Sequence, residues 1–398
     1  MPSSNLPIVR LKKRRALPFF SQHPWVYQTA IESITGSPDL GAEVELRSHE
    51  GQFVARGLYN PFSKIRVRLY SWDEEQRLDG SLWRDRIGRA LGLRERLFQG
   101  LPAHQACRLI FSEADQLSGL TVDRFGEFLV VQWTSAALAA QQEEILFILN
   151  EFLSPRGIWL STEKGIGKLE GLDLNDGPLS GDVPDSPLVI EENGLKYTVD
   201  LRQGQKTGFY FDQRDNRMRL RDYAQGRVLD VCCYSGAFAL NAAQTQCESI
   251  VAVDSSESAI ELARTNAELN GVVDRIEFRV DDMFDAIADL QAEGQQFDTI
   301  VLDPPKMART RGGLNRALKG YIRLNQAAMQ ILKPGGILMT CSCSGLVSRE
   351  DFEQILLQTS LESGRHLQLL EQRGASPDHP VSVNCLESNY LKCFVCRI

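Results

Sequence analysis

The sequence predicts an α/β protein in which a Rossmann-like domain follows a small β-barrel and a small α+β domain. Apolar strands alternate with helical segments from about residue 190 onward, which is typical of a parallel sheet covered by helices. Residues 1–72 contain short alternating strands, whereas residues 73–187 mix helical and strand patterns. A polar segment rich in Gly, Pro and Asp, residues 171–187, marks the last boundary. We therefore expect three domains, at 1–72, 73–187 and 188–398.

The first two domains show their elements through periodicity. Alternation predicts strands at 42–48, 52–59 and 64–72, with turns at Gly51 and at Asn60-Pro61. In the central domain, helical spacing appears at 82–98 and 139–153. Residues 120–133 predict a hairpin with its turn at Phe125-Gly126.

The last domain is predicted to be a parallel sheet with helices between its strands. Strands are expected at 227–234, 249–256, 275–282, 297–305, 336–344 and 390–398, and helices at 235–246, 258–271 and 321–332. The helix at 258–271 has Ser255 or Ser256 as its cap and Gly271 as its stop. Pro334-Gly335-Gly336 is expected to precede the apolar run of the strand at 336–344. Ligands of such sheets bind beyond the carboxyl ends of the strands, so a binding site is expected at these ends.

Composition and charge limit the class of protein. The chain has 398 residues, 43% of them hydrophobic, and shows no membrane-length apolar run and no secretory signal, so we expect a cytoplasmic protein with no membrane partner. Its nine cysteines are then expected to be thiols, and its five histidines form no metal-ligand pattern. The net charge is −8, yet residues 1–72 carry +5, with five basic residues within Arg10–Arg15. A basic module on an acidic body favours a polyanionic partner, although a solvated basic tail would look the same.

Acidic residues end the first two predicted strands of the last domain. Asp230 leads into a tight turn that carries Gly236, and Asp254 ends the next strand. An acid in the second place can hydrogen-bond both ribose hydroxyls of a nucleoside cofactor, although Asp254 could also cap a helix. The turn lacks the G-x-G-x-x-G pattern, and Asp230 would repel a pyrophosphate. These residues favour the cationic methionine end of S-adenosylmethionine over a dinucleotide.

The third and fourth strands end in two further polar groups. Asp282 could accept a hydrogen bond from an adenine amino group while Met283 lies against the ring, or the pair could be an exposed acidic turn. The fourth strand ends in Asp303-Pro304-Pro305-Lys306. The two prolines disfavour a helix at this point, so the backbone carbonyl groups here have no helical N–H groups to bond to. This segment resembles the Asp/Asn-Pro-Pro-aromatic motif of base amino-methyltransferases, but Lys306 stands in place of the aromatic residue.

Two cysteines end the fifth strand. Methylation of carbon 5 of a pyrimidine requires a thiolate that first adds to carbon 6, because carbon 5 is otherwise a poor nucleophile. Cys341 and Cys343 are two residues apart and share a face of a strand. Cys343 lies nearer the carboxyl end, so we take it as the nucleophile and Cys341 as a packing residue. The residues alone leave a structural role open for both.

Together these motifs resemble the bacterial large-subunit rRNA methyltransferases that modify carbon 5 of a cytidine in 23S rRNA, the RlmI-like group. The resemblance covers nearly the whole chain. Residues 23–27 and 55–72 look like the family's PUA domain, an RNA-binding barrel, and residues 119–132 look like its central domain. The most specific segments are 205–217 (QKTGFYFDQRDNR), 303–306 (DPPK) and 342–346 (SCSGL).

The resemblance implies a class I methyltransferase that uses S-adenosylmethionine and acts on 23S rRNA or its precursor. It implies Cys343 as nucleophile and Asp303 as the acid that holds the base edge. The implied cofactor contacts are Gln213, Arg214, Asp230, Gly236, Asp254 and Asp282. Gln213 and Arg214 also start a predicted helix where they could grip a carboxylate, and Lys206 to Gly208 is expected to be a loop. A homodimer stays open as the oligomeric state.

Three other interpretations stay open on the sequence. Asp303-Pro304-Pro305 could serve a base amino-methyltransferase, but Lys306 and Cys343 argue against it. The chain could be an RNA-binding protein without catalysis, and fold alone cannot exclude this. An oxidoreductase is disfavoured because G-x-G-x-x-G is missing.

Overall fold

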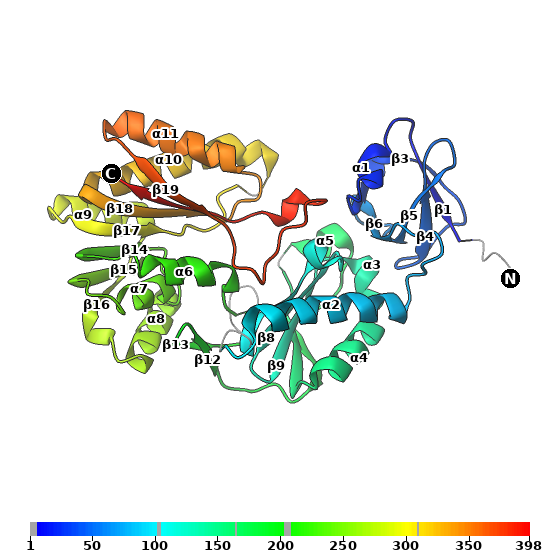
Figure 1. Ribbon diagram of the computed structural model, residues 1–398, viewed down its shortest axis with the longest axis horizontal. Helices are drawn as coiled ribbons and strands as arrows, with labels where there is room; N and C mark the ends of the chain where they lie inside the picture. The colour runs from blue at the N-terminus through cyan, green and yellow to red at the C-terminus, as the bar shows by residue number, and fades with distance from the viewer. Residues whose placement is uncertain (1–5, 102–104, 164, 203–207, 309) are drawn as a thin grey trace. The chain divides into compact units, whose positions relative to one another are not determined.

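The computed structural model describes residues 6–101, 105–163, 165–202, 208–308 and 310–398, which belong to two compact units (Figure 1). The first unit comprises residues 1–188, 199–210 and 377–388, and the second comprises 189–198, 211–376 and 389–398. The first unit therefore contains both the expected barrel and the expected central domain. Residues 205–207 lie outside the described residues; they begin the segment 205–217 that resembles the large-subunit rRNA methyltransferases. Of the loop expected at Lys206 to Gly208, only Gly208 is described.

Six strands of the described part form the sheet of the N-terminal barrel, in the order β2-β6-β5-β4-β1-β3. They are β1 (Ile8–Leu11), β2 (Trp25–Tyr27), β3 (Ile31–Ile34), β4 (Glu43–Arg47), β5 (Phe53–Tyr59) and β6 (Ile65–Ser71), and helix α1 (Leu17–Phe20) lies between β1 and β2. Strands β4, β5 and β6 confirm the three predicted from alternation. The other three strands have at most four residues each, which is too short for a clear alternating pattern.

The central part builds a second sheet, in the order β11-β10-β9-β8-β7. Its elements are α2 (Gly80–Phe98), β7 (Ala106–Phe111), β8 (Leu120–Phe125), β9 (Phe128–Trp133), α3 (Ala136–Ala139), α4 (Gln142–Leu153), β10 (Gly157–Leu160), α5 (Ile166–Glu170) and β11 (Gly177–Gly181). The predicted hairpin is β8–β9, but Phe125 still pairs with Phe128. The turn is therefore Gly126 and Glu127, one residue beyond the predicted position.

Within this unit, α2 and the barrel strand β6 share a buried aromatic contact. The rings of Trp83 on α2 and Tyr70 on β6 meet edge to face, with centroids 5.2 Å apart, and both side chains are fully buried. Tyr70 Oη also donates a 2.6 Å hydrogen bond to the carbonyl oxygen of Ser118 in the central part. An aromatic pair of this kind is worth about 0.5–1.5 kcal/mol beyond its buried area, so it ties the barrel to the central sheet.

The second unit is built on a sheet of seven described strands, in the order β16-β15-β14-β17-β18-β20-β19. These strands are β14 (Arg227–Val231), β15 (Ser249–Asp254), β16 (Ile276–Val280), β17 (Phe297–Leu302), β18 (Leu332–Ser342), β19 (Gln368–Arg373) and β20 (Lys392–Arg397). Strands β14 to β18 pair in parallel, as predicted, whereas β20 runs antiparallel between β18 and β19. The hairpin strands β12 (Leu188–Glu192) and β13 (Leu195–Val199) precede this sheet.

Helices cover both faces of this sheet (Figure 1). On one face lie α6 (Arg214–Leu220), α7 (Ala237–Ala242) and α8 (Glu257–Leu269), and on the other α9 (Met283–Ala292), α10 (Leu314–Ile331) and α11 (Arg349–Ser363). Ser256 caps α8 by accepting a hydrogen bond from the backbone N–H of Ala259. In the described part of the chain, no helix is both long and apolar enough to cross a membrane.

The expectation for Pro334-Gly335-Gly336 is wrong. Strand β18 begins at Leu332, so these residues lie inside the strand instead of preceding it. The pairing of β17 with β18 shifts register between Phe297 and Thr299, and Gly335 has a φ of +79°. The strand therefore starts with an irregular segment that tolerates proline and glycine.

Candidate active site at the carboxyl ends of the parallel strands

The loop after β14 is shaped by three residues with positive φ. Cys232, Tyr234 and Gly236 have φ values of +63°, +47° and +75°. A Cβ on Gly236 would lie 3.0 Å from the Cβ of Ala263 on α8. Glycine is therefore favoured at 236 both by its left-handed backbone and by the close approach of α8. The loop turns the chain sharply at the carboxyl end of β14, where the sequence predicts a cofactor.

Asp230 is a fully buried carboxyl group at this end of the sheet. Its Oδ2 accepts a 2.9 Å hydrogen bond from the backbone N–H of Ala239, whereas its Oδ1 has no partner among the described residues. Burial raises the pKa of Asp230 to about 7, and the charges of Asp303 and Asp254 act in the same direction. A buried acceptor without a partner is costly, so this oxygen is suited to a donor or a cation that a ligand brings.

Asp254 ends β15 and holds the loop in place. Its Oδ2 accepts a 2.9 Å hydrogen bond from the backbone N–H of Tyr234, and its Oδ1 accepts one of 3.0 Å from that of Ser256. The cap of α8 is Ser256, so the alternative of Asp254 as a helix cap is wrong. A carboxylate accepts about four hydrogen bonds, which leaves capacity for hydroxyl donors from a ligand.

Cys232 lies near four of the acidic residues that the sequence predicts for the site. Burial raises the pKa of its thiol, and the charges of Asp254, Asp303, Asp230 and Asp282 contribute in that order. The thiol therefore stays protonated, and these four carboxyl groups, from four different strand ends, share one neighbourhood. Such a concentration of acids favours a cationic ligand.

Asp282 and Met283 begin α9 at the end of β16. Asp282 is the N-cap, and its Oδ1 accepts a 2.8 Å hydrogen bond from the backbone N–H of Phe284. Its side chain is exposed, so the exposed acidic turn and a ligand contact are compatible. Met283 Sδ lies 3.8 Å from Cys232 Sγ, which places this methionine beside the loop after β14.

Gln213 and Arg214 lie at the start of α6, and their side chains are buried. Gln213 Oε1 accepts a 2.7 Å hydrogen bond from Asn216, while its Nε2 forms no hydrogen bond of good geometry within the described part. The Gln213 side chain also lies beside the Cys341 thiol, whose pKa it lowers. Arg214 Nε lies 3.5 Å from Glu192 Oε2, and its guanidinium stacks over Phe211. Glu192 gave no signal in the sequence, because its partners are distant in the chain. Gln213 thus offers a donor to a ligand, whereas the described ion pair of Arg214 is with Glu192.

The segment Asp303-Pro304-Pro305-Lys306 directly follows β17. The backbone N–H of Asp303 donates a 3.3 Å hydrogen bond to the carbonyl oxygen of Val231, which joins this segment to the end of β14. Pro304 is buried, whereas Pro305 and Lys306 are exposed. The position of the missing aromatic residue is therefore occupied by a solvated cation.

The two cysteines of β18 differ in their surroundings. Cys341 is fully buried, and its Cα pairs with that of Cys393 across β18 and β20. Contact with Cys393 and burial raise the pKa of the Cys341 thiol. Cys343 follows the last residue of the strand, is partly exposed, and has its Sγ 4.0 Å from the carbonyl oxygen of Pro304. Only the second thiol combines solvent access with contact to the Asp-Pro-Pro segment.

A buried hydroxyl network supports the Cys343 segment. Ser342 Oγ donates a 2.9 Å hydrogen bond to Tyr321 Oη, and Ser344 Oγ lies 3.1 Å from the same oxygen. Ser344 Oγ also accepts a 3.1 Å hydrogen bond from the backbone N–H of Ala308. These contacts fix both neighbours of Cys343. Tyr321 was not predicted as part of the site, because its helical periodicity marks it only as a core residue.

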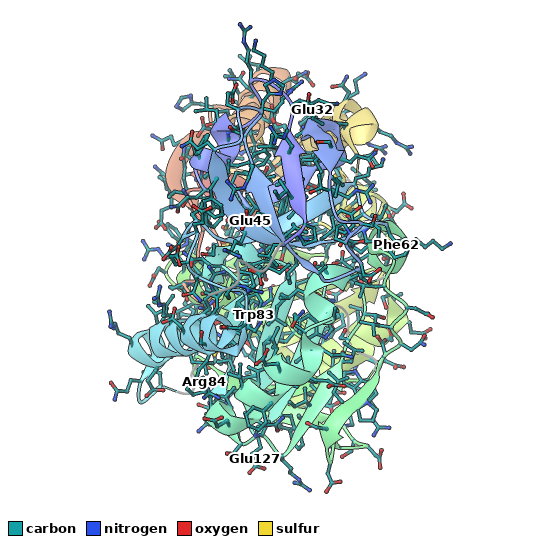
Figure 2. All side chains as sticks on the ribbon, turned by 90° about the vertical axis from the view of Figure 1, so that its right-hand side faces the viewer. Glu32, Glu45, Phe62, Trp83, Arg84 and Glu127 are labelled. Carbon is teal, nitrogen blue, oxygen red and sulfur yellow. The ribbon has the colours of Figure 1, made fainter. Side chains whose placement is uncertain are left out.

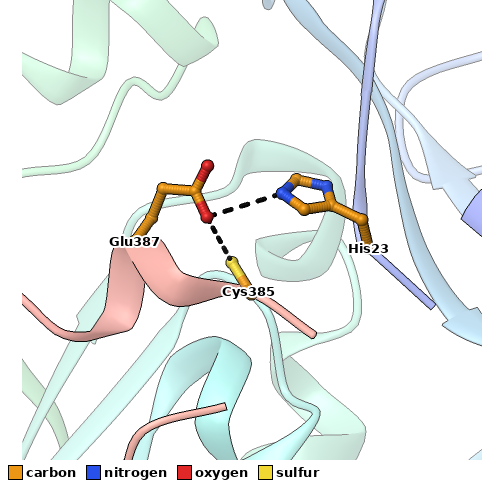
Figure 3. A group of neighbouring side chains, drawn as sticks. All are labelled: His23, Cys385 and Glu387. Carbon is orange, nitrogen blue, oxygen red and sulfur yellow. Dashed lines mark hydrogen bonds and ion pairs between the residues drawn. The ribbon is translucent and has the colours of Figure 1, made fainter. Parts of the chain in front are cut away.

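A second group of donor side chains lies in the first unit: His23, Cys385 and Glu387 (Figure 3). The sequence showed no histidine ligand pattern, because His23 and Cys385 are far apart in the chain. Glu387 Oε2 lies 3.5 Å from His23 Nε2 and 3.4 Å from Cys385 Sγ. The backbone N–H of Trp25 donates to His23 Nδ1, so the neutral ring carries its proton on Nε2, the atom that faces the group. This pattern favours a hydrogen-bonded cluster over a metal ligand, whose second ring nitrogen usually donates.

Comparisons with known proteins agree with this geometry. Residues 9–72 match the PUA-like domain model, and residues 175–391 match the S-adenosylmethionine-dependent methyltransferase model. The chain is 38% identical over 392 residues to ribosomal RNA large subunit methyltransferase I of Escherichia coli strain K12, and the match covers 98% of both proteins. The protein of that name from E. coli O127:H6 (strain E2348/69 / EPEC) has the same identity and coverage.

Two solved structures share the fold of this chain. One is a candidate methyltransferase complexed with SAH, with a TM-score of 0.85 at 20% identity, covering 98% of this chain and 100% of that one. The other is a candidate SAM-dependent methyltransferase from Streptococcus mutans, with a TM-score of 0.83 at 20% identity and the same coverage. The family model spans more than half of the chain, and the curated relatives span almost all of it. The chain therefore belongs to the S-adenosylmethionine-dependent methyltransferases, in the family of ribosomal RNA large subunit methyltransferase I.

Proposed function

We propose that this protein methylates carbon 5 of a cytidine in 23S rRNA or its precursor, with S-adenosylmethionine as methyl donor and Cys343 as nucleophile. The rRNA substrate follows from the relatives, whose name says that they methylate ribosomal RNA of the large subunit. The choice of carbon 5 rests chiefly on one observation: a partly exposed thiol follows β18 and contacts the Asp-Pro-Pro segment.

The residues at the strand ends fit the cofactor. Asp230 Oδ1 is a buried acceptor without a described partner, and four carboxyl groups gather around Cys232, which suits a cation. We assign the ammonium of the methionine end to Asp230, the ribose to Asp254, and the adenine to Asp282 and Met283. Gly236 lets the loop approach the cofactor, and Gln213 with Arg214 would hold its carboxylate. When bound, S-adenosylmethionine supplies the methyl group as an electrophilic carbon on a cationic sulfur.

The protein groups then act in a defined order. The Cys343 thiolate adds to carbon 6 of the cytosine, and the electron pair of the 5,6 double bond makes carbon 5 nucleophilic enough to accept the methyl group. The methyl group would give up its bond to the cofactor sulfur as the new bond to carbon 5 forms, and the sulfur would keep the electron pair. Asp303 holds the pyrimidine edge, which requires a proton on either Asp303 or the ring nitrogen. A base then removes the proton from carbon 5, the 5,6 double bond re-forms, the bond between carbon 6 and Cys343 Sγ breaks, and Cys343 leaves as a thiolate.

RNA binding is assigned to the N-terminal barrel. The side chains from Lys12 to Arg15 are exposed, and Phe62 projects from the turn between β5 and β6 with an exposure of 66% (Figure 2). Cations neutralise phosphates, and an exposed aromatic ring can stack on an unpaired base. The target base must leave its stack to reach Cys343, since side chains cannot read the deep groove of an RNA helix. On this proposal the protein works in the cytoplasm, and the homodimer stays a prediction.

A base amino-methyltransferase is the second candidate. Its motif places an aromatic side chain after Asp-Pro-Pro, and here that place is held by the exposed Lys306. It would also leave Cys343 without a role in the reaction. We therefore favour carbon-5 methylation, and identifying the methylated nucleoside in the product separates the two candidates.

Single-turnover methylation of unmodified 23S rRNA by Cys343→Ser and Cys341→Ser tests the proposal. We expect 5-methylcytidine from the unaltered protein and from Cys341→Ser, and none from Cys343→Ser, although Cys343→Ser should bind the cofactor normally. A product methylated on an exocyclic amino group, or full activity of Cys343→Ser, would refute the carbon-5 mechanism.

A further inference from the structure

Lys392, the first residue of β20, is a buried lysine beside the proposed nucleophile. Its exposure is 3%, and its Nζ donates hydrogen bonds of 2.7 Å to the carbonyl oxygen of Ser344 and 2.8 Å to that of Tyr390. Within the described part of the chain, no carboxylate forms an ion pair with this ammonium. A buried cation without an anion is costly, so its retention needs an explanation.

The sheet register brings Lys392 to Cys343. Lys392 pairs with Ser342, the last residue of β18, and Cys343 follows directly. The hydrogen bond from Nζ to Ser344 then fixes the residue on the other side of the nucleophile. Lys392 therefore holds residues 342–344 in position from β20, while Tyr321 on α10 bonds to side chains of the same segment.

Among the charged groups around Lys392, a charge on Cys343 has the largest effect on the lysine. Burial lowers the pKa of Lys392 to about 8. Four nearby groups have smaller effects on this pKa, in decreasing order: a charge on Cys343 raises it, Arg349 lowers it, Asp351 raises it and Lys306 lowers it. Among these four groups the Cys343 thiolate therefore acts most strongly. A cation next to a thiol stabilises the thiolate in return, since the coupling is mutual.

We propose that Lys392 is a positioning residue that stabilises the Cys343 thiolate through its ammonium and orients it through its hydrogen bond to Ser344. This inference rests on the proposed role of Cys343. It assigns the lysine no contact with the RNA or the cofactor, because both of its described hydrogen bonds go to backbone carbonyls. The two groups titrate as a pair, so the thiolate gains most while the lysine keeps its proton.

Alkylation of Cys343 measures the thiolate without any turnover. The full-length protein, with neither RNA nor cofactor, is treated with iodoacetamide from pH 6 to pH 10, and the rate at Cys343 is followed by peptide mapping. Lys392→Gln removes the charge but keeps an N–H donor for Ser344, whereas Lys392→Arg keeps the charge. Lys333→Met is the matched control, since Lys333 lies at the start of β18 and pairs with Asp298.

The expected result is a shift in the pH midpoint of alkylation. Lys392→Gln should raise the midpoint by about one unit or more, which is about a tenfold loss of thiolate at pH 7. Lys392→Arg and Lys333→Met should stay within about half a unit of the unaltered protein. An unchanged midpoint in folded Lys392→Gln would overturn the inference.

Lys392→Arg tests the inference even if the neutral variant does not fold. A shift of about one unit or more in Lys392→Arg would overturn the inference, because that variant keeps the charge. If Cys343→Ser methylates RNA normally, the proposed function fails whatever the alkylation shows. If Cys343→Ser is inactive but the midpoint does not depend on Lys392, only the inference fails.

Discussion

Asp254 Oδ2 accepts a 2.9 Å hydrogen bond from the backbone N–H of Tyr234, which ties the end of β15 to the loop after β14. The residue proposed to bind the cofactor ribose therefore also shapes the loop that approaches the cofactor. A substitution of Asp254 should affect both functions at once.

Asp254→Ala should weaken the binding of S-adenosylmethionine by on the order of 10- to 100-fold. A hydrogen bond to a charged group is worth roughly 1.5–3 kcal/mol, and this change removes the acceptor for the ribose as well as the support of Tyr234. Isothermal titration calorimetry gives the affinity. Asp274→Ala, at an exposed acid outside the site, is the control, and unchanged affinity in well-folded Asp254→Ala would refute the ribose assignment.

Cofactor affinity should rise with pH around neutrality. The pKa of Asp230 is raised to about 7 by burial, so the carboxyl group is largely protonated below that value and ionised above it. The cationic cofactor prefers the ionised form, and its affinity should increase from pH 6 to pH 8. Calorimetry over this range tests the effect, which should be much smaller in Asp230→Asn. An equally steep rise in that variant would assign the titration to another group.

Asp230 should also make the folded protein less stable as pH rises. Its pKa is higher in the folded state than the ordinary value of 3.8, so its contribution to stability is full below that value and is lost on approach to about pH 7. Asp230→Asn cannot ionise and should lose less stability between pH 5 and pH 8. Thermal unfolding without cofactor at several pH values measures this, and an identical pH dependence of the two proteins would contradict it.

Cys341→Ser should reduce stability more than rate. The side chain is fully buried against Cys393, and a hydroxyl without a good partner there costs about 1–3 kcal/mol. Chemical denaturation should show this loss, while single-turnover methylation should stay within a few fold of the unaltered protein. Cys393→Ser, on the facing strand, is the matched variant and should behave in the same way. A large loss of methylation rate in a stable Cys341→Ser variant would show that the Cys341 thiol takes part in methyl transfer.

Neutralising Lys13, Arg14 and Arg15 should flatten the salt dependence of RNA binding. These side chains are exposed, whereas Lys12 and Arg10 donate hydrogen bonds to the carbonyl oxygens of Thr29 and His49. Each lost phosphate contact should reduce the slope of log K against log salt by roughly 0.7 on single-stranded RNA. Filter binding at several salt concentrations measures the slope.

The control for the basic run neutralises Arg89 and Arg96, two exposed arginines of α2. We expect this control to leave the slope unchanged. If the triple variant and the control give the same slope as the unaltered protein, residues 13–15 are a solvated tail.

The sequence predicted the sheet well, because apolar strands and amphipathic helices alternate and the carboxyl ends of parallel strands meet at one edge. The strand pattern alone therefore predicts that Asp230, Asp254, Asp282 and Asp303 lie together, and all four act on the thiol of Cys232. The partners of side chains could not be predicted, because they depend on strand order. The insertion of β20 between β18 and β19 brings Lys392 to Ser344, and nothing local in the chain indicates it. The division into domains at 72 and 187 stays a prediction.

Cys343 is proposed to form a bond to carbon 6 of the target cytidine, and trapping with 5-fluorocytidine detects that bond. Fluorine at carbon 5 cannot leave as a proton does, so the adduct should persist after methyl transfer. Mass spectrometry of the digested complex should find the nucleotide on Cys343, and Cys343→Ser should form no adduct. A nucleotide on Cys341, or methylation of the unmodified RNA without any trapped adduct on the fluorinated RNA, would refute Cys343 as the nucleophile.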